Sequence, residues 1–137
     1  YFHNGVPRKY KGYCTDIFFN EAKSFMKAQS ELGKPFFTYI STNAPHSPMV
    51  CDEKYWKHYT QAPYNLPVKE AIFYGMIENI DENVGSLRQW LVETGLDENT
   101  IFKLLAESLR LMPAFWFPEA KLKNAFISSR NISFRLK

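Results

Sequence analysis

A single histidine framed by two prolines is the strongest candidate for chemistry in this sequence. Residues 43–48 read NAPHSP, so His46 lies between Pro45 and Pro48, and Asn43 stands three positions before it. Proline restricts its own φ angle and the conformation of the residue before it, which holds the imidazole in a narrow range of directions. Such an imidazole can donate a proton to a leaving group or bind an anion. On spacing alone, an ordinary surface-loop histidine is the more common explanation.

The other metal-binding or nucleophilic side chains give weaker signals. Cys14 and Cys51 lack the spacing of a zinc site and are too few for a disulfide framework, so ordinary thiols are expected. His3 and His58 have no partner at ligand spacing and are expected at the surface. Four carboxylates in residues 68–94 could resemble a metal cluster, but they are expected to solvate a helix face: Glu78, Asp81, Glu82 and Glu93.

The histidine loop follows an apolar run that predicts a strand. Residues 35–40, PFFTYI, are rich in aromatic and β-branched side chains and show no clean polar alternation. This pattern is typical of a strand covered on both faces, as in a parallel sheet between helix layers. The carboxyl edge of such a sheet is where ligands bind, and this places His46 at a plausible site.

Helices are expected on both sides of this strand. Residues 16–32 predict an amphipathic helix capped by Thr15 or Asp16 and ended by Gly33, and residues 51–59 are helical in tendency. Residues 68–94 predict a long amphipathic helix ended by Gly95, where Gly75 and Gly85 indicate a close approach or a kink. Residues 1–11 read as a surface loop, and residues 97–99 as a turn into a strand near residue 100. Three aromatic residues could line a cleft or simply pack under the loop: Tyr55, Trp56 and Tyr59.

Four stretches together resemble the sulfatase family, particularly bacterial-type arylsulfatases. They are GYCTDIFFNEA (12–22), FFTYISTNAPHSP (36–48), FYGMIENIDENVGSL (73–87) and TGLDENTIF (94–102), in family order and at family-like separations. The resemblance implies an α/β fold, a partial alkaline-phosphatase-like sandwich with a mostly parallel sheet between helices. It also implies a parent activity of sulfate-ester hydrolysis. His46 matches the substrate-contacting histidine on the leaving-group side, while Asn43 either holds the loop or approaches the substrate.

Other parts of the family pattern are missing. The family uses a divalent cation, calcium, and a formylglycine made from the Cys or Ser of a C/S-x-P/A-x-R motif. Neither Cys14 nor Cys51 begins such a motif, and the Asp-Asn-Gly turn expected after Phe102 is absent, as are the upstream Asp pair and the sulfate-gripping Lys and His. The resemblance therefore implies an internal piece of a larger catalytic domain, with no cofactor site of its own and no activity in isolation.

The chain is expected to divide at residue 102. Residues 1–102 form the sulfatase-like part, and residues 103–137 form a divergent tail with seven Lys and Arg against two Glu. A shifted reading frame, a truncation or a fusion would explain the change. The tail could form an amphipathic helix through Leu104, Leu105, Leu109 and Leu111, or lie on a membrane or nucleic acid, although no recognition motif supports nucleic-acid binding. Asn131 begins a glycosylation acceptor pattern, which is common by chance.

Composition limits the remaining choices. An apolar fraction of 45% over 137 residues indicates a packed globular protein. No signal peptide and no membrane-spanning run is visible. A noncatalytic binding protein that reuses a sulfatase segment and a phosphate-ester hydrolase of the related alkaline-phosphatase superfamily stay open as alternatives. The compartment, the sulfate ester and the oligomeric state cannot be read from the sequence.

Overall fold

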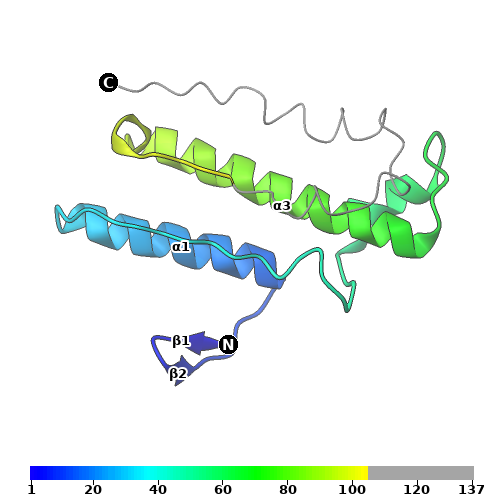
Figure 1. The fold of residues 1–137 in the computed structure, drawn as a ribbon, viewed down its shortest axis with the longest axis horizontal. Helices are drawn as coiled ribbons and strands as arrows, with labels where there is room; N and C mark the ends of the chain where they lie inside the picture. The colour runs from blue at the N-terminus through cyan, green and yellow to red at the C-terminus, as the bar shows by residue number, and fades with distance from the viewer. Residues whose placement is uncertain (105–137) are drawn as a thin grey trace. The chain divides into compact units, whose positions relative to one another are not determined.

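The computed structural model describes residues 1–104. The chain divides into two compact units, Tyr1–Asn99 and Thr100–Lys137, and the architecture below is that of the first. Its elements follow in the order β1 (Phe2–His3), β2 (Val6–Pro7), α1 (Cys14–Glu31), α2 (Glu53–Trp56), the short 3-10 helix η1 (Lys57–Thr60), α3 (Val68–Glu93) and η2 (Asp97–Asn99) (Figure 1). The boundary predicted at residue 102 stays a prediction.

The first residues form a small antiparallel hairpin rather than the predicted loop. Phe2 pairs with Pro7 and His3 pairs with Val6. Asn4 and Gly5 between them have φ angles of 52° and 80°, and two consecutive positive φ angles are the signature of a tight type I′ turn. The Asn-Gly dipeptide was the sequence signal for this turn, and the absence of flanking alternation concealed it.

Helix α1 confirms the first predicted helix but begins differently. Its N-cap residue is Tyr13, whose side chain makes no capping hydrogen bond. The prediction that Thr15 or Asp16 caps the helix was wrong, because the structure places both residues inside the first turn. There Thr15 is fully buried, and Asp16 accepts hydrogen bonds from α3.

Both long helices end at the predicted glycines. Gly33 and Gly95 have φ angles of 65° and 69°. Each donates its N–H three residues back, to Ser30 O at 2.9 Å and to Val92 O at 3.0 Å. The residue after each glycine also donates its N–H, Lys34 to Gln29 O and Leu96 to Leu91 O, and this second bond completes a Schellman motif. The glycines are required here because the left-handed conformation is costly for residues with a Cβ.

The predicted strand is not paired in the part of the chain that the structure describes. No secondary structure is assigned to residues 34–43, which Figure 1 shows drawn out along the length of α1. Side chains alternate: Phe36, Thr38 and Ile40 are half-buried, whereas Phe37 is 87% exposed and Tyr39 is 75% exposed. Residues 1–104 therefore cover only one face of this segment, and cover on the second face stays a prediction for the complete domain. Neighbouring strands must supply a ladder, and residues 1–104 contain none beside this segment.

Helices α1 and α3 run in the same direction. Near one end Asp16 on α1 accepts from Asn79 on α3, and further along Lys23 Nζ donates to Ser86 Oγ at 2.8 Å. Both links join residues 63 positions apart, so the register advances equally along the two helices. Figure 1 shows the same parallel arrangement. Apolar side chains form the core of this unit: Ile17, Phe19, Ala22, Met26, Ala44, Tyr55, Ala71, Met76, Leu87 and Leu91. Phe25 on α1 and Leu32 directly after it are exposed.

The short helix α2 packs against α3 at Gly75. A Cβ added at Gly75 would lie 2.8 Å from Trp56 Cβ and 3.0 Å from the carbonyl carbon of Tyr55. The prediction of a close approach is thus confirmed at Gly75, whereas a Cβ at Gly85 would meet nothing within 4 Å. Asp52, directly before α2, caps this helix: its Oδ1 accepts from Lys54 N at 3.1 Å.

The last described residues, 100–104, carry no assigned strand, so the strand predicted there is not formed in the described part of the chain. Three predictions concern residues beyond the described part of the chain: the tail helix, the binding of the tail to a membrane or nucleic acid, and the glycosylation pattern at Asn131. Within residues 1–104, no helix has both the length and the apolar character needed to cross a membrane.

Candidate functional site

The loop that carries His46 is a closed turn at the end of the extended segment. His46 N donates to Asn43 O at 3.0 Å, and Thr42 Oγ1 donates to Ala44 O at 3.1 Å. The Ala44–Pro45 and Ser47–Pro48 peptide bonds are both cis. Ala44 is buried and fixes the turn on the body of the unit, while His46 itself is exposed.

The imidazole of His46 is oriented by one hydrogen bond. Its Nδ1 lies 2.7 Å from Ser47 O. A carbonyl oxygen only accepts, so Nδ1 carries the hydrogen and the neutral ring presents the lone pair of Nε2. Nε2 makes no hydrogen bond within residues 1–104, and the residue as a whole is exposed. Such a ring can take up a proton at Nε2 and give it to a leaving oxygen.

Asn43 contributes to this loop through its backbone. Its carbonyl closes the turn, and its exposed side chain makes no hydrogen bond to the described residues. Any residue could supply this carbonyl, so the expectation that Asn43 itself holds the loop stays a prediction. A contact with substrate remains a prediction for both Asn43 and His46.

The far end of the loop lies against the beginning of α1. Burial is the main cause that raises the pKa of the Cys51 thiol to about 11, and the nearby carboxylates of Asp52, Asp16 and Glu78 add to it. Burial likewise raises the pKa of Tyr13 to about 12, with further contributions from both cysteines. Cys14 and Cys51 are both free thiols. For Cys51, the raised pKa is the opposite of what a nucleophilic thiolate needs.

A polar cluster at the same end joins α1 to α3. Asp16 Oδ1 accepts from Asn79 Nδ2 at 2.8 Å and from Asn83 Nδ2 at 2.7 Å. Asn83 Nδ2 also donates to Asn79 O at 2.9 Å. Asn79 is fully buried. The sequence reasoning missed this cluster. The available signal was a pair of asparagines spaced by four on the buried face of a helix, where apolar residues are the norm.

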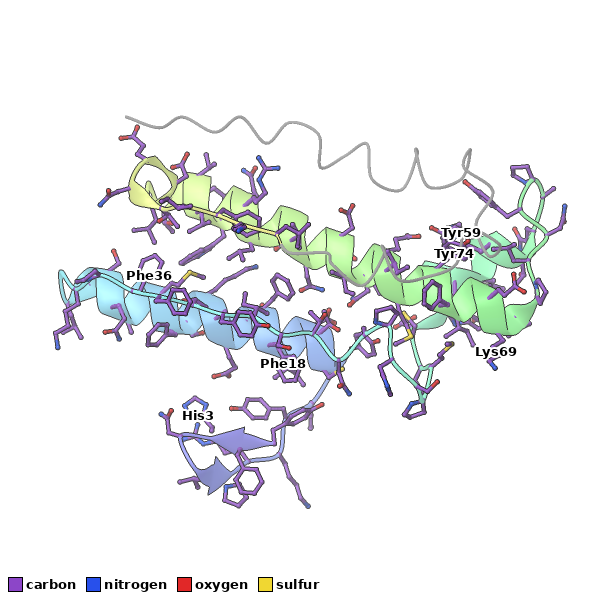
Figure 2. All side chains as sticks on the ribbon, in the orientation of Figure 1. His3, Phe18, Phe36, Tyr59, Lys69 and Tyr74 are labelled. Atoms are coloured by element: carbon purple, nitrogen blue, oxygen red, sulfur yellow. The ribbon has the colours of Figure 1, made fainter. Side chains whose placement is uncertain are left out.

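The aromatic residues after the loop are packing residues. Tyr55 is buried and its hydroxyl donates to Glu82. Tyr59 lies beside Tyr74 (Figure 2), with the two ring centroids 5.6 Å apart. The ring centroid of Tyr64 is 5.2 Å from that of Tyr59. The pKa of Tyr59 is raised, mainly by burial and to a lesser extent by a hydrogen bond to the carboxylate of Glu78. The structure therefore supports the interpretation that these aromatic residues pack against one another, and not the alternative that they line a cleft for a ring-shaped substrate.

Two histidines that were expected to lack partners have them. His58 Nε2 lies 3.2 Å from Glu78 Oε2, and His3 Nδ1 lies 3.2 Å from Glu21 Oε2. His3 Nδ1 is also 3.0 Å from the Tyr10 hydroxyl. These carboxylates lie 18 or more positions away in the sequence, so local spacing could not reveal them.

An open hollow of about 510 Å³ lies over α2 and η1. Charged and polar side chains line it: Asp52, Glu53, Lys54, Lys57, His58 and Gln61. Its lysines are matched by carboxylates, since Lys57 Nζ lies 3.3 Å from Glu53 and Lys54 Nζ lies 4.0 Å from Glu82. His46 does not line it, so the hollow and the histidine loop are separate features.

The described residues do not fit a calcium site. Calcium takes six to eight oxygen ligands, mostly from carboxylates and carbonyls. Across residues 1–104, no three His, Cys, Asp or Glu side chains are grouped to hold a metal ion. Glu78 and Glu82 are instead engaged by His58 and Tyr55.

Comparison with known proteins identifies the family. The sulfatase family profile matches residues 1–107. The chain belongs to the sulfatase family. It is 27% identical to N-acetylgalactosamine-6-sulfatase of Canis lupus familiaris over 86 residues, which are 63% of this chain and 15% of that protein. It is 25% identical to the uncharacterized sulfatase YdeN of Escherichia coli (strain K12) over 100 residues, 72% of this chain and 17% of that protein. No solved structure matches the chain significantly.

The comparisons confirm the resemblance drawn from the four sequence stretches. The family implies an alkaline-phosphatase-like α/β fold. The chain spans less than a fifth of the length of the relatives named above, and the described residues show its helices without the sandwich.

Proposed function

We propose that this chain supplies the leaving-group side of a sulfatase active site, in which His46 protonates the departing alcohol or phenol during sulfate-ester hydrolysis. The observation that carries the proposal is the orientation of His46. Its Nδ1 donates to Ser47 O at 2.7 Å, and its Nε2 makes no hydrogen bond within residues 1–104. Protonation of the leaving oxygen by a positioned histidine is a common means of lowering the barrier for ester cleavage.

The arrangement of the elements supports an alkaline-phosphatase-like sandwich for the complete domain. Helices α1 and α3 run parallel, and residues 34–43 return along α1 between them in the sequence. Parallel helices joined through an extended return segment are typical of α/β units, whereas two consecutive helices of a bundle run antiparallel. In such a sandwich, neighbouring strands would pair with residues 35–40 and cover Phe37 and Tyr39.

Sulfatase chemistry also needs groups that this chain does not provide. A formylglycine would supply the nucleophile and a divalent cation would neutralise the sulfate oxygens. Neither cysteine begins the maturation motif, and the carboxylates of residues 1–104 are not grouped for a cation. We therefore expect the isolated chain to be inactive, since loss of even one such group commonly costs orders of magnitude in rate.

The test begins with the coding DNA on both sides of this chain, translated in all frames. The proposal expects a C/S-x-P/A-x-R motif upstream and an Asp-Asn-Gly turn downstream of Phe102. A domain that joins these frames is then expressed and given 4-nitrophenyl sulfate and phenyl sulfate. Absence of both motifs in a continuous gene would exclude sulfatase catalysis. Turnover of phosphate esters in place of sulfate esters would favour the phosphate-ester alternative.

The role of His46 is tested by its leaving-group dependence. His46→Ala is expected to lower kcat for phenyl sulfate by about 10²–10⁴-fold, the usual contribution of a general acid. The loss should be much smaller for 4-nitrophenyl sulfate, because nitrophenolate leaves without a proton. Ser41→Ala is the matched control, since Ser41 is exposed in the same segment. Equal losses on the two esters would show that His46 is not the acid.

A further inference from the structure

Asp16 occupies the point where the two long helices are joined at the end nearest the histidine loop. Its Oδ1 accepts two amide hydrogens, from Asn79 at 2.8 Å and from Asn83 at 2.7 Å. Asn79 is fully buried, so its amide cannot turn to water for another acceptor. A carboxylate acceptor makes such hydrogen bonds stronger than a neutral one would.

The segment that carries the histidine loop passes the N-terminal end of α1, where Asp16 lies, on its way to α2 (Figure 1). Cys51 follows His46 by five residues, and Asp16 is close enough to contribute to the raised pKa of the Cys51 thiol. Tyr13, which directly precedes α1, interacts with Cys51 as well. Cys51 is followed at once by Asp52, which caps α2, and α2 packs tightly on α3 at Gly75. The stretch between His46 and α2 therefore ends beside the start of α1, at Cys51, and leads directly into a helix that packs on α3.

We propose that Asp16 is a positioning residue for His46. Asp16 fixes the first turn of α1 against α3 and so fixes the position of the surface beside which the loop lies. The position of the loop in turn sets the direction of His46 Nε2. The proposal rests on the function proposed above, in which Nε2 gives its proton to the leaving group.

A second polar link between the same helices allows the local role to be separated from overall stability. Lys23 Nζ donates to Ser86 Oγ at 2.8 Å, seven residues further along each helix. Buried apolar side chains lie between and beyond the two links, among them Ile17 and Leu87. Loss of Asp16 should therefore loosen the end nearest the loop and leave the remaining contact in place. Ser86→Ala removes the other link and is the matched control.

The orientation of His46 can be read directly, without catalysis, from the nitrogen resonances of the full 137-residue chain. The chain has three histidines, so 15N-histidine labelling gives a simple spectrum, and His46→Gln assigns the loop ring. At about pH 8, the hydrogen bond to Ser47 predicts an Nδ1–H tautomer for His46. Asp16→Ala should lower the ratio of Nδ1–H to Nε2–H forms by about threefold to tenfold, as expected for loss of one net hydrogen bond. Asp16→Asn, which keeps one acceptor oxygen, should lower it less, and Ser86→Ala should leave it unchanged.

The outcomes separate the positioning role from the proposed function. An unchanged tautomer ratio in Asp16→Ala, or equal changes in Asp16→Ala and Ser86→Ala, would overturn the positioning role. If Asp16→Ala fails to fold, Asp16→Asn decides on the same criterion. In the joined domain, Asp16→Ala should reduce turnover of phenyl sulfate more than of 4-nitrophenyl sulfate, and should add little to the loss in His46→Ala. If His46→Ala shows a leaving-group-dependent loss and Asp16→Ala does not, the positioning role is refuted and the proposed function stands. If His46→Ala shows no loss, the proposed function is refuted, and with it the effect of Asp16 on turnover.

Discussion

Two glycines on one helix provide a sharp test of the packing between α2 and α3. Gly75 and Gly85 both lie within α3, so Gly→Ala should gain the same intrinsic helix stability at each position, about 0.5–1 kcal/mol. Their surroundings differ. A Cβ at Gly85 would meet nothing within 4 Å, while a Cβ at Gly75 would lie 2.8 Å from Trp56 Cβ and 3.1 Å from Trp56 Cα.

The contact at Gly75 cannot be relieved by rotating a side chain. The nearest atoms belong to the backbone and the Cβ of α2, so the whole short helix must move away from α3. Overpacking of this kind typically costs about 1–3 kcal/mol. We therefore expect Gly85→Ala to be more stable than the parent by about 0.5–1 kcal/mol, and Gly75→Ala to lie about 1–3 kcal/mol below Gly85→Ala.

The assay is urea unfolding followed by far-ultraviolet circular dichroism, with both variants and the parent measured under the same conditions. The comparison of the two variants cancels the helix-propensity gain, so the difference between their free energies of unfolding reports the contact itself. Equal stabilities for Gly75→Ala and Gly85→Ala would refute the close approach of α2. A stabilised Gly75→Ala would show that α2 does not pack there at all.

Three further predictions concern single side chains. Tyr55→Phe should lower the free energy of unfolding by about 1 kcal/mol, because the hydroxyl hydrogen bond to Glu82 is lost, and urea unfolding measures it. The pKa values of Cys51 and Tyr13 are raised on folding from 9.0 to about 11 and from 10.0 to about 12. As the pH rises, the unfolded chain therefore releases these protons before the folded chain does. The free energy of unfolding should be at its full value below pH 9 and should fall as the pH rises from 9 towards 12. In unfolding curves recorded across this range, Cys51→Ser should flatten the first part of that fall. His46→Ala should change stability by less than about 0.5 kcal/mol in the same assay, because the ring is exposed; a larger loss would mean that the ring supports the fold.

The sequence by itself determined the helices and the family. Apolar spacing placed α1 and α3 to within a few residues, because a helix of this length is specified by its own 3.6-residue repeat. Gly33 and Gly95 marked the helix ends, since only a residue without a Cβ enters the left-handed region cheaply. The four family stretches were likewise readable, and the match over residues 1–107 confirms them.

Only the tertiary structure decided which groups meet. Residues 35–40 have the composition of a strand, yet a strand exists only with a neighbour to complete its ladder, and residues 1–104 place none beside them. Thr15 and Asp16 are good capping residues by type, but in the structure both lie inside the helix. Asp16 there accepts hydrogen bonds from two asparagines of α3 that lie 63 and 67 positions away in the sequence. The ion pairs of His3 and His58 arise in the same way. Local propensity depends on a few neighbouring residues, whereas hydrogen bonds between elements depend on how those elements pack in three dimensions. The pattern of a single sequence does not reveal that packing.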